Sequence, residues 1–131
     1  MITILETINK YLDSVKMARS AHTASTYKNA MQYFMQTLTD HHLDISKAPI
    51  SDLSEDSVVW LAADLKEHAA TTERLYLTAA TGFFEYVAAE NLAPVNLPRI
   101  RLLIQQRARK PGQRLPQFPA SAIEKVLEQA D

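Results

Sequence analysis

Apolar side chains recur at intervals of three and four residues along much of the chain, and they are densest between Thr71 and Glu90. On a helix these apolar positions cover more than half of the circumference and leave a narrow polar stripe. The apolar positions are Leu75, Tyr76, Ala79, Ala80, Phe83, Phe84, Tyr86 and Val87, and the polar stripe is Thr71, Arg74, Thr78, Thr81 and Glu85. Gly82 costs a helix about 1 kcal/mol relative to Ala, which indicates close contact with another helix there. The pattern predicts a central helix around which the others pack.

Two amphipathic helices are predicted ahead of it, the first over Thr3–Ala18 and the second after a polar turn at Arg19–His22. Thr3 and Glu6 have the spacing of a capping box at the first helix start. The expected cap of the second helix is Thr23 or Ser25, and its apolar stripe is Ala24, Tyr27, Met31, Phe34, Met35 and Leu38. The helical period of this stripe assigns it to the core.

A third helix is predicted after a loop over residues 41–53, where the apolar residues lose their periodicity. Ser54 followed by Glu55 and Asp56 suits a helix start, because side-chain acceptors and acids complement its free N–H groups. The expected buried face is Val58, Leu61, Ala62, Leu65 and Ala69, and a turn at His68–Thr72 leads to the central helix with Thr71 or Thr72 as its cap. Together the four helices predict an all-α bundle.

The character of the chain changes after Asn91. Pro94 and Pro98 are expected to end any helix; residues 99–107 are compatible with a short helical or docked segment, and residues 108–119 with a linker. Ser121 and Glu124 again have capping-box spacing, ahead of a new apolar stripe of Ile123, Val126, Leu127 and Ala130. We therefore expect a helical domain over 1–98, a basic interdomain linker over 99–119, and the start of a second, truncated domain over 120–131.

The net charge of −1 conceals an uneven distribution. Residues 1–98 contain 7 Lys/Arg and 12 Asp/Glu, whereas residues 99–114 contain 6 Lys/Arg and no acid. Such a basic block is typical of an arm that binds a polyanion, and equally of a solvated linker. The chain has no cysteine and no apolar run of the roughly 20 residues that a membrane span needs, so we expect a cytoplasmic protein without membrane contact.

Residues with catalytic or metal-binding chemistry do not form a pattern. His41 and His42 are adjacent and would diverge on a helix, and the two glycines exclude a phosphate-binding loop. The tyrosines fit helix packing better than nucleophilic catalysis. We expect no catalytic residue, metal, cofactor or small-molecule substrate. The polar residues at two helix starts suit either phosphate binding or plain capping; they are Arg19, His22, Thr23, Ser25, Thr26 and Lys28 at one start, and Thr71, Thr72 and Arg74 at the other.

Two stretches carry a family resemblance. ASTYKNAMQYF (Ala24–Phe34) and TTERLYLTAATGFFEYVAAENLAP (Thr71–Pro94) resemble motifs of the N-terminal core-binding, SAM-like domain of tyrosine recombinases, the phage-integrase and Xer-like family. The basic linker ending in Arg114, Leu115 and Pro116 is similar to that family's passage into its catalytic domain. The family's catalytic residues lie in that C-terminal domain and are absent from this chain. The connector departs from the family's Asn-Pro, since Leu92 and Ala93 separate Asn91 from Pro94.

The resemblance implies a four-helix bundle that clamps duplex DNA together with the missing domain, and self-association of the full-length protein on DNA. The implied DNA contacts are Arg19, Ser25, Thr26, Lys28, Thr71, Thr72, Arg74, Thr78, Arg99, Arg101, Arg107, Arg109, Lys110 and Arg114. One alternative is a helical protein–protein interaction module that docks a partner through Ile100–Ile104 and the last helix. A helix-turn-helix regulator fits less well, because the helix over Thr71–Glu90 is too apolar to read DNA.

Overall fold

A computed structural model describes residues 2–107 of the chain, and the described part is all-helical. The five α-helices are α1 (Ile4–Ala18), α2 (Ala21–Asp40), α3 (Asp56–Asp64), α4 (Ala70–Ala89) and α5 (Leu97–Arg107), with two short 3-10 turns, η1 (Ile50–Asp52) and η2 (Leu65–Glu67). Within residues 2–107, extended pairing is limited to one isolated bridge between Thr3 and Pro49. The expectation of an all-α protein is confirmed.

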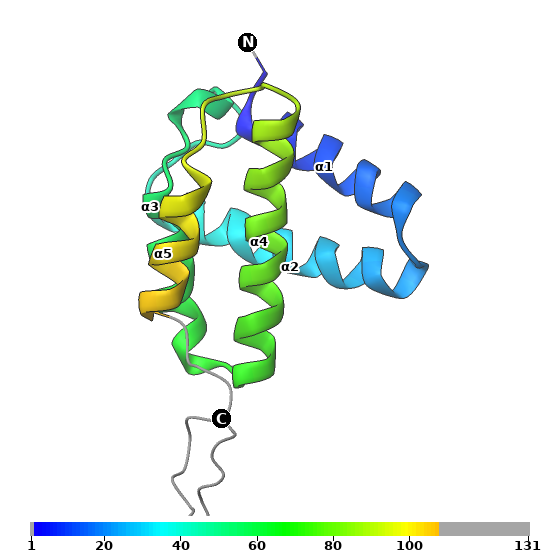
Figure 1. Cartoon of the computed structure of the whole chain (residues 1–131). Helices are drawn as coiled ribbons and strands as arrows, with labels where there is room; N and C mark the ends of the chain where they lie inside the picture. The colour runs from blue at the N-terminus through cyan, green and yellow to red at the C-terminus, as the bar shows by residue number, and fades with distance from the viewer. Residues whose placement is uncertain (1, 108–131) are drawn as a thin grey trace, which may run out of the picture.

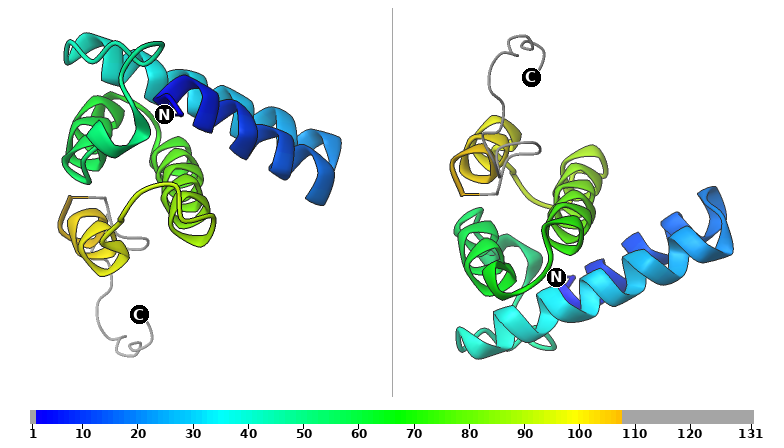
Figure 2. Two further views of the ribbon diagram at one scale, coloured as in Figure 1. Left: turned by 90° about the horizontal axis from the view of Figure 1, so that it is seen from above. Right: turned by 90° about the horizontal axis from the view of Figure 1, so that it is seen from below.

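The helices form two antiparallel pairs that cross each other. Figure 1 shows α1 and α2 running side by side, while α4 stands across α2 and is antiparallel to α3. Helix α5 lies beside α3 and α4 and completes the second layer. Both views in Figure 2 show the turn between α1 and α2 projecting beyond the other helices. The bundle therefore has a compact end built on α3 and α5 and a protruding end made of one helical hairpin.

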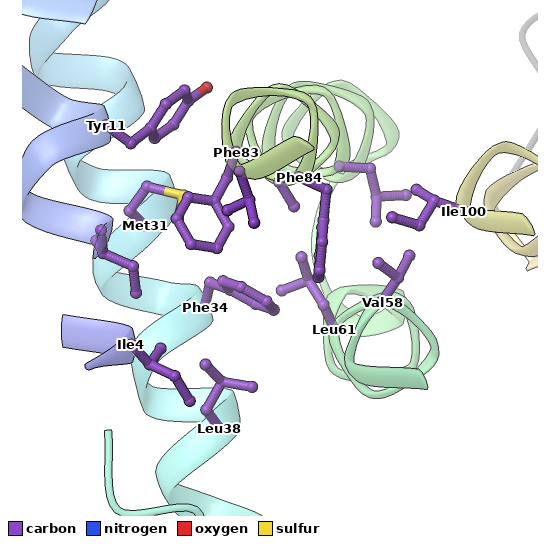
Figure 3. Close-up of a cluster of buried hydrophobic side chains, with 14 of the residues drawn as sticks. Ile4, Tyr11, Met31, Phe34, Leu38, Val58, Leu61, Phe83, Phe84 and Ile100 are labelled. Carbon is purple, nitrogen blue, oxygen red and sulfur yellow. The ribbon is translucent and has the colours of Figure 1, made fainter. Parts of the chain in front are cut away.

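The core lies where the two layers cross, and α4 contributes to it from two adjacent sides. Phe83 and Phe84 are buried, and their ring centroids each lie 6.4 Å from that of Phe34 on α2. Figure 3 shows Phe83 on the side of α2 and Phe84 extending toward Leu61 of α3. The central position predicted for this helix is confirmed, because its apolar face is wide enough to contact both layers.

Gly82 allows α1 to approach α4 closely, as its position in the helix predicts. A Cβ built on Gly82 would lie 2.5 Å from the hydroxyl oxygen of Tyr11 on α1. That hydroxyl donates a hydrogen bond to the carbonyl of Ala79 at 3.1 Å, and burial raises the pKa of Tyr11 well above its usual value. The tyrosine thereby ties the outer helix pair to the central helix.

The predicted helix caps are partly right. Thr3 and Glu6 form the capping box expected for α1. The cap of α2 is Ser20, whose hydroxyl accepts a hydrogen bond from the Thr23 backbone N–H at 3.2 Å, so the prediction of Thr23 or Ser25 is wrong. Helix α4 begins after Ala69 and has no side-chain cap, so Thr71 and Thr72 are not caps either. Ser and Thr are both preferred N-cap residues, so a stretch with several of them does not show which one is the cap. The residue at which the folded helix begins decides it.

Two residues that the sequence assigned to buried faces, Ala69 and Leu75, are exposed, whereas the charged residue Glu73 is buried. Ala69 lies in the turn before α4, and Leu75 is 39% exposed. Glu73, on the first turn of α4, is 1% exposed and accepts a charge-assisted hydrogen bond from Lys66 of η2 at 3.2 Å. The start of α4 is therefore rotated so that an acid paired with η2 faces inward.

Helix α5 forms where the sequence suggested a helical or docked segment, but Pro98 does not end a helix. Pro98 lies in the first turn of α5, where a backbone N–H is not needed, and the Asn96 side chain accepts a hydrogen bond from the Arg99 N–H at 3.1 Å. Ile100 and Leu103 of α5 are buried. Residues 97–107 thus pack with the helical domain rather than serving as linker; the rest of the expected linker, 108–119, and the expected second domain, 120–131, lie outside the described residues.

Candidate nucleic-acid interface

The predicted contact residues of α2 lie on the protruding hairpin. Ser25 and Lys28 are exposed and face a groove of about 610 Å³ between α1 and α2. The groove is lined by Asn9, Leu12, Asp13 and Lys16 from α1 and by Ala21, Ala24, Ser25 and Lys28 from α2. Its two lysines, on opposite helices, outnumber its one acid, Asp13, and with the polar side chains of Asn9 and Ser25 they form a surface that suits phosphate oxygens. Lys16 and Asn9 were not predicted, because only the folded hairpin places them opposite α2.

Two further predicted residues of this region, Thr26 and Arg19, do not line the groove. The Thr26 hydroxyl donates to the carbonyl of His22 at 3.1 Å within its own helix, so its proton is already used. Arg19 is exposed in the turn between α1 and α2, at the projecting tip, beside Met17, which is 89% exposed. The tip therefore presents a cation and an apolar side chain with no neighbouring helix over them.

The predicted residues of α4 form a second exposed surface. Thr71 and Arg74 are exposed and Thr72 is half-buried, all in the first two turns of α4. The Thr78 hydroxyl donates to the carbonyl of Arg74 at 2.8 Å, so it is engaged within the helix. Arg74 is not among the residues that line the α1–α2 groove. The structure thus places Lys28 and Arg74 on separate helices rather than around one cavity.

The arginines of α5 are engaged with carboxylates of the same molecule. The Arg99 guanidinium lies 2.6 Å from Oδ1 of Asp56 and 3.4 Å from Oε1 of Glu55, both at the start of α3. Hydrogen bonding to Arg99 holds the pKa of Asp56 below its usual value. Arg101 lies 3.4 Å from Oε2 of Glu85 on α4. Both arginines are therefore already paired with carboxylates, and a phosphate could bind them only by displacing those carboxylates.

The end of α5 is also held by the body of the protein. The Lys66 ammonium group, which pairs with Glu73, donates to the carbonyl of Arg107, and the Arg107 guanidinium donates to the Gln106 side chain at 3.2 Å. Lys66 on η2 and Glu73 on α4 are separated by a turn, so the pairing rule for neighbours three or four residues apart on one helix does not predict their contact. The remaining predicted contacts, Arg109, Lys110 and Arg114, lie outside the described residues.

Charge is distributed unequally between the two ends of the bundle. Residues 9–28, here called the outer hairpin, contain four Lys/Arg and one acid, whereas residues 40–67, the acidic end, contain two Lys/Arg and seven acids. The cations of the outer hairpin are Lys10, Lys16, Arg19 and Lys28; all are exposed, and none forms an ion pair within residues 2–107. A polyanion would therefore be attracted by the outer hairpin and repelled by the acidic end.

The acidic end carries a smaller cleft of its own. It measures about 290 Å³ and is lined by Tyr33, Gln36, Thr37, Asp40, Ala63, Asp64 and Glu67. Asp64 accepts a hydrogen bond from Thr37 at 2.8 Å, and Asp40 accepts one from Gln36 at 2.9 Å. Three carboxylates make this cleft unsuitable for phosphate.

The described residues contain neither a metal-binding group nor a membrane-spanning helix. Comparisons with known proteins identify no family. Across residues 2–107, no group of three or more His, Cys, Asp or Glu side chains is placed to hold a metal ion. None of the helices in that range is both long and apolar enough to span a membrane. No protein-family model, curated protein or solved structure matches the chain.

Proposed function

We propose that this chain is the DNA-binding N-terminal domain of a site-specific tyrosine recombinase, with the core-binding, SAM-like fold that its sequence resembles. Strand cleavage and exchange would belong to a C-terminal catalytic domain, and this chain would position the duplex. The proposal is supported by the all-helical fold and by two exposed surfaces at α2 and α4 where the resembling motifs lie. It also includes self-association of the full-length protein on DNA.

The observation that carries the proposal is the set of unpaired cations on the outer hairpin. Lys16 and Lys28 line one groove from opposite helices, and Asn9 and Ser25 add hydrogen-bonding groups to its lining. Phosphate contacts of this kind fix the position of a protein on DNA without reading its sequence.

Helix α4 supplies a second contact in this proposal. Arg74 and Thr71 are exposed near the start of α4, where the first backbone N–H groups have no side-chain cap. Exposed N–H groups at a helix start favour an anion. A duplex held by the outer hairpin and by α4 would contact two surfaces of this domain, and the proposed catalytic domain would complete the clamp.

The test is binding of the full chain to duplex DNA, measured by fluorescence anisotropy across a series of salt concentrations. Each lysine or arginine that neutralises a phosphate contributes about −0.9 to the slope of log affinity against log salt. Lys28→Ala is expected to weaken binding and to make the slope about 0.9 less steep. Arg74→Ala is expected to act in the same way through the second surface.

Lys47→Ala is the matched control, because Lys47 is an exposed lysine in the loop of the acidic end. It is expected to leave both affinity and slope close to those of the unchanged protein. Absence of salt-dependent binding by the full-length parent, or equal losses in Lys28→Ala and Lys47→Ala, would contradict the proposal.

A helical protein–protein interaction module is the second candidate function. Its predicted docking stretch, Ile100–Ile104, is largely used inside the molecule, since Ile100 and Leu103 are buried and Leu102 is 51% exposed. The α1–α2 groove, with its apolar residues Leu12 and Ala24, is the surface that favours this function. This function predicts association without DNA, visible by light scattering, that Arg74→Ala leaves unchanged because Arg74 does not line the groove.

A further inference from the structure

Helix α5 carries two arginines whose side chains reach solvent and yet are paired with acids. The side chains of Arg99 and Arg101 are 41% and 60% exposed, so solvent reaches both. Each meets carboxylates from another helix: Asp56 and Glu55 for Arg99, and Glu85 for Arg101. The arginines of α5 thus differ from the lysines of the outer hairpin, which are exposed and form no ion pair in the described part of the chain.

A carboxylate is a chemical substitute for a phosphate at a guanidinium group. Both present two oxygens that accept the parallel N–H groups of arginine. The backbone of α5 is held by Ile100 and Leu103, which are buried, so an exchange of partner at Arg101 needs a side-chain rotation rather than a movement of the helix. The Arg101–Glu85 distance of 3.4 Å and the exposure of both groups make this pair the easier one to exchange.

We propose that Glu85, together with Glu55 and Asp56, acts as an internal competitor of DNA that occupies Arg101 and Arg99 until duplex phosphates displace it. The proposal rests on the DNA-binding function proposed above and adds a regulatory contact to it. Binding then has two parts. The outer hairpin binds through free cations, and α5 adds its arginines only when the phosphate concentration near them is high enough to displace the acids.

The competitor for Arg99 is held more firmly than the competitor for Arg101. Asp56 lies 2.6 Å from the guanidinium, and Glu55 is fixed in addition by the Asn96 N–H at 2.9 Å. Arg101 is therefore expected to be released first. The order of release makes Glu85 the residue whose removal gives the clearest signal.

The experiment compares Glu85→Gln with Glu90→Gln in the full chain, using duplex DNA and fluorescence anisotropy over a salt series. Both changes remove one exposed acid from the same end of α4, but Glu90 has no ion pair within residues 2–107. An exposed pair is weak, so Glu85→Gln is expected to raise affinity about twofold to fivefold above Glu90→Gln. Its salt slope is expected to match that of Glu90→Gln, because Arg101 neutralises the same phosphate in both proteins once Glu85 has been displaced.

Arg101→Ala in the Glu85→Gln background is the second variant, and it is expected to remove the whole gain. Thermal unfolding of each variant, followed by circular dichroism, confirms that the comparison is made between folded proteins. Equal effects of Glu85→Gln and Glu90→Gln would overturn the competitor proposal while DNA binding by the unchanged protein stands. A gain that persists without Arg101 would overturn it too. Absence of binding by every variant would remove the proposed function and this inference together.

Discussion

The outer hairpin and helix α5 both carry cations on exposed helical surfaces, but their charges have different surroundings. Lys16 and Lys28 of the outer hairpin meet no carboxylate partner in the described structure, whereas Arg99 and Arg101 of α5 lie within 3.4 Å of acids. The most basic stretch of the sequence therefore begins with charges that are already compensated. A count of positive residues locates a candidate interface only after the partners of each charge are known.

The difference follows from the way each region is packed. The outer hairpin projects from the bundle and meets α4 through Tyr11, so its polar face has no neighbouring helix (Figures 1 and 2). Helix α5 lies against α3 and α4 and is surrounded by the acids on them. We expect changes in α5 to alter stability first, and changes to the cations of the outer hairpin to alter binding first.

The largest expected effect concerns the attachment of α5. Ile100→Ala removes a fully buried side chain of the core and is expected to lower the free energy of unfolding by about 2 to 5 kcal/mol. Urea denaturation followed by circular dichroism measures this loss. Leu102→Ala, on the exposed side of the same helix, is the control and is expected to change stability by about 0.5 kcal/mol or less. Equal effects of the two changes would mean that α5 is not part of the core.

The contact that anchors the outer hairpin gives the next effect. Gly82→Ala places a methyl group 2.5 Å from the Tyr11 hydroxyl, and such overpacking costs about 1 to 3 kcal/mol. Ala favours the helix by about 1 kcal/mol, so a net loss of about 1 kcal/mol is expected. In a Tyr11→Phe background the clash is absent, and the same change is expected to be neutral or stabilising. A loss that is equal in both backgrounds would show that the hydroxyl is not the obstacle.

The smallest expected effect is a pH dependence from the ion pair of α5. The pKa of Asp56 is lowered from 3.8, chiefly by its hydrogen bond to Arg99, so the folded state favours the ionised carboxylate. Its contribution to stability is complete above the unfolded pKa and is lost as the pH falls through the lower folded value. Asp56→Asn is expected to reduce the melting temperature near neutral pH, with a difference that shrinks below about pH 4.

Asp52→Asn is the control for that titration, because no ion pair of Asp52 is present in residues 2–107. The melting temperature of this variant near neutral pH is expected to stay close to that of the unchanged protein. If Asp56→Asn leaves the melting temperature equally unchanged, the pair with Arg99 contributes nothing to the attachment of α5.

The sequence by itself determined the helical class, the central helix, the capping box at Thr3 and the close contact at Gly82. Each depends on side-chain periodicity or on neighbours three or four residues apart, which a linear pattern records. It also showed which residues of α2 and α4 are polar, and Lys28 and Arg74 are exposed as that pattern indicates. The implied DNA contacts remain predictions of the resemblance.

Only the tertiary structure decided which charges are free. Arg99 is 43 residues from Asp56 and 44 from Glu55 in sequence, and no local rule pairs them. The same holds for the burial of Glu73 and for the opposition of Lys16 to Lys28 across a groove. Electrostatic partners are set by the distance between side chains after packing, because Coulomb energy falls with separation in space and not along the chain.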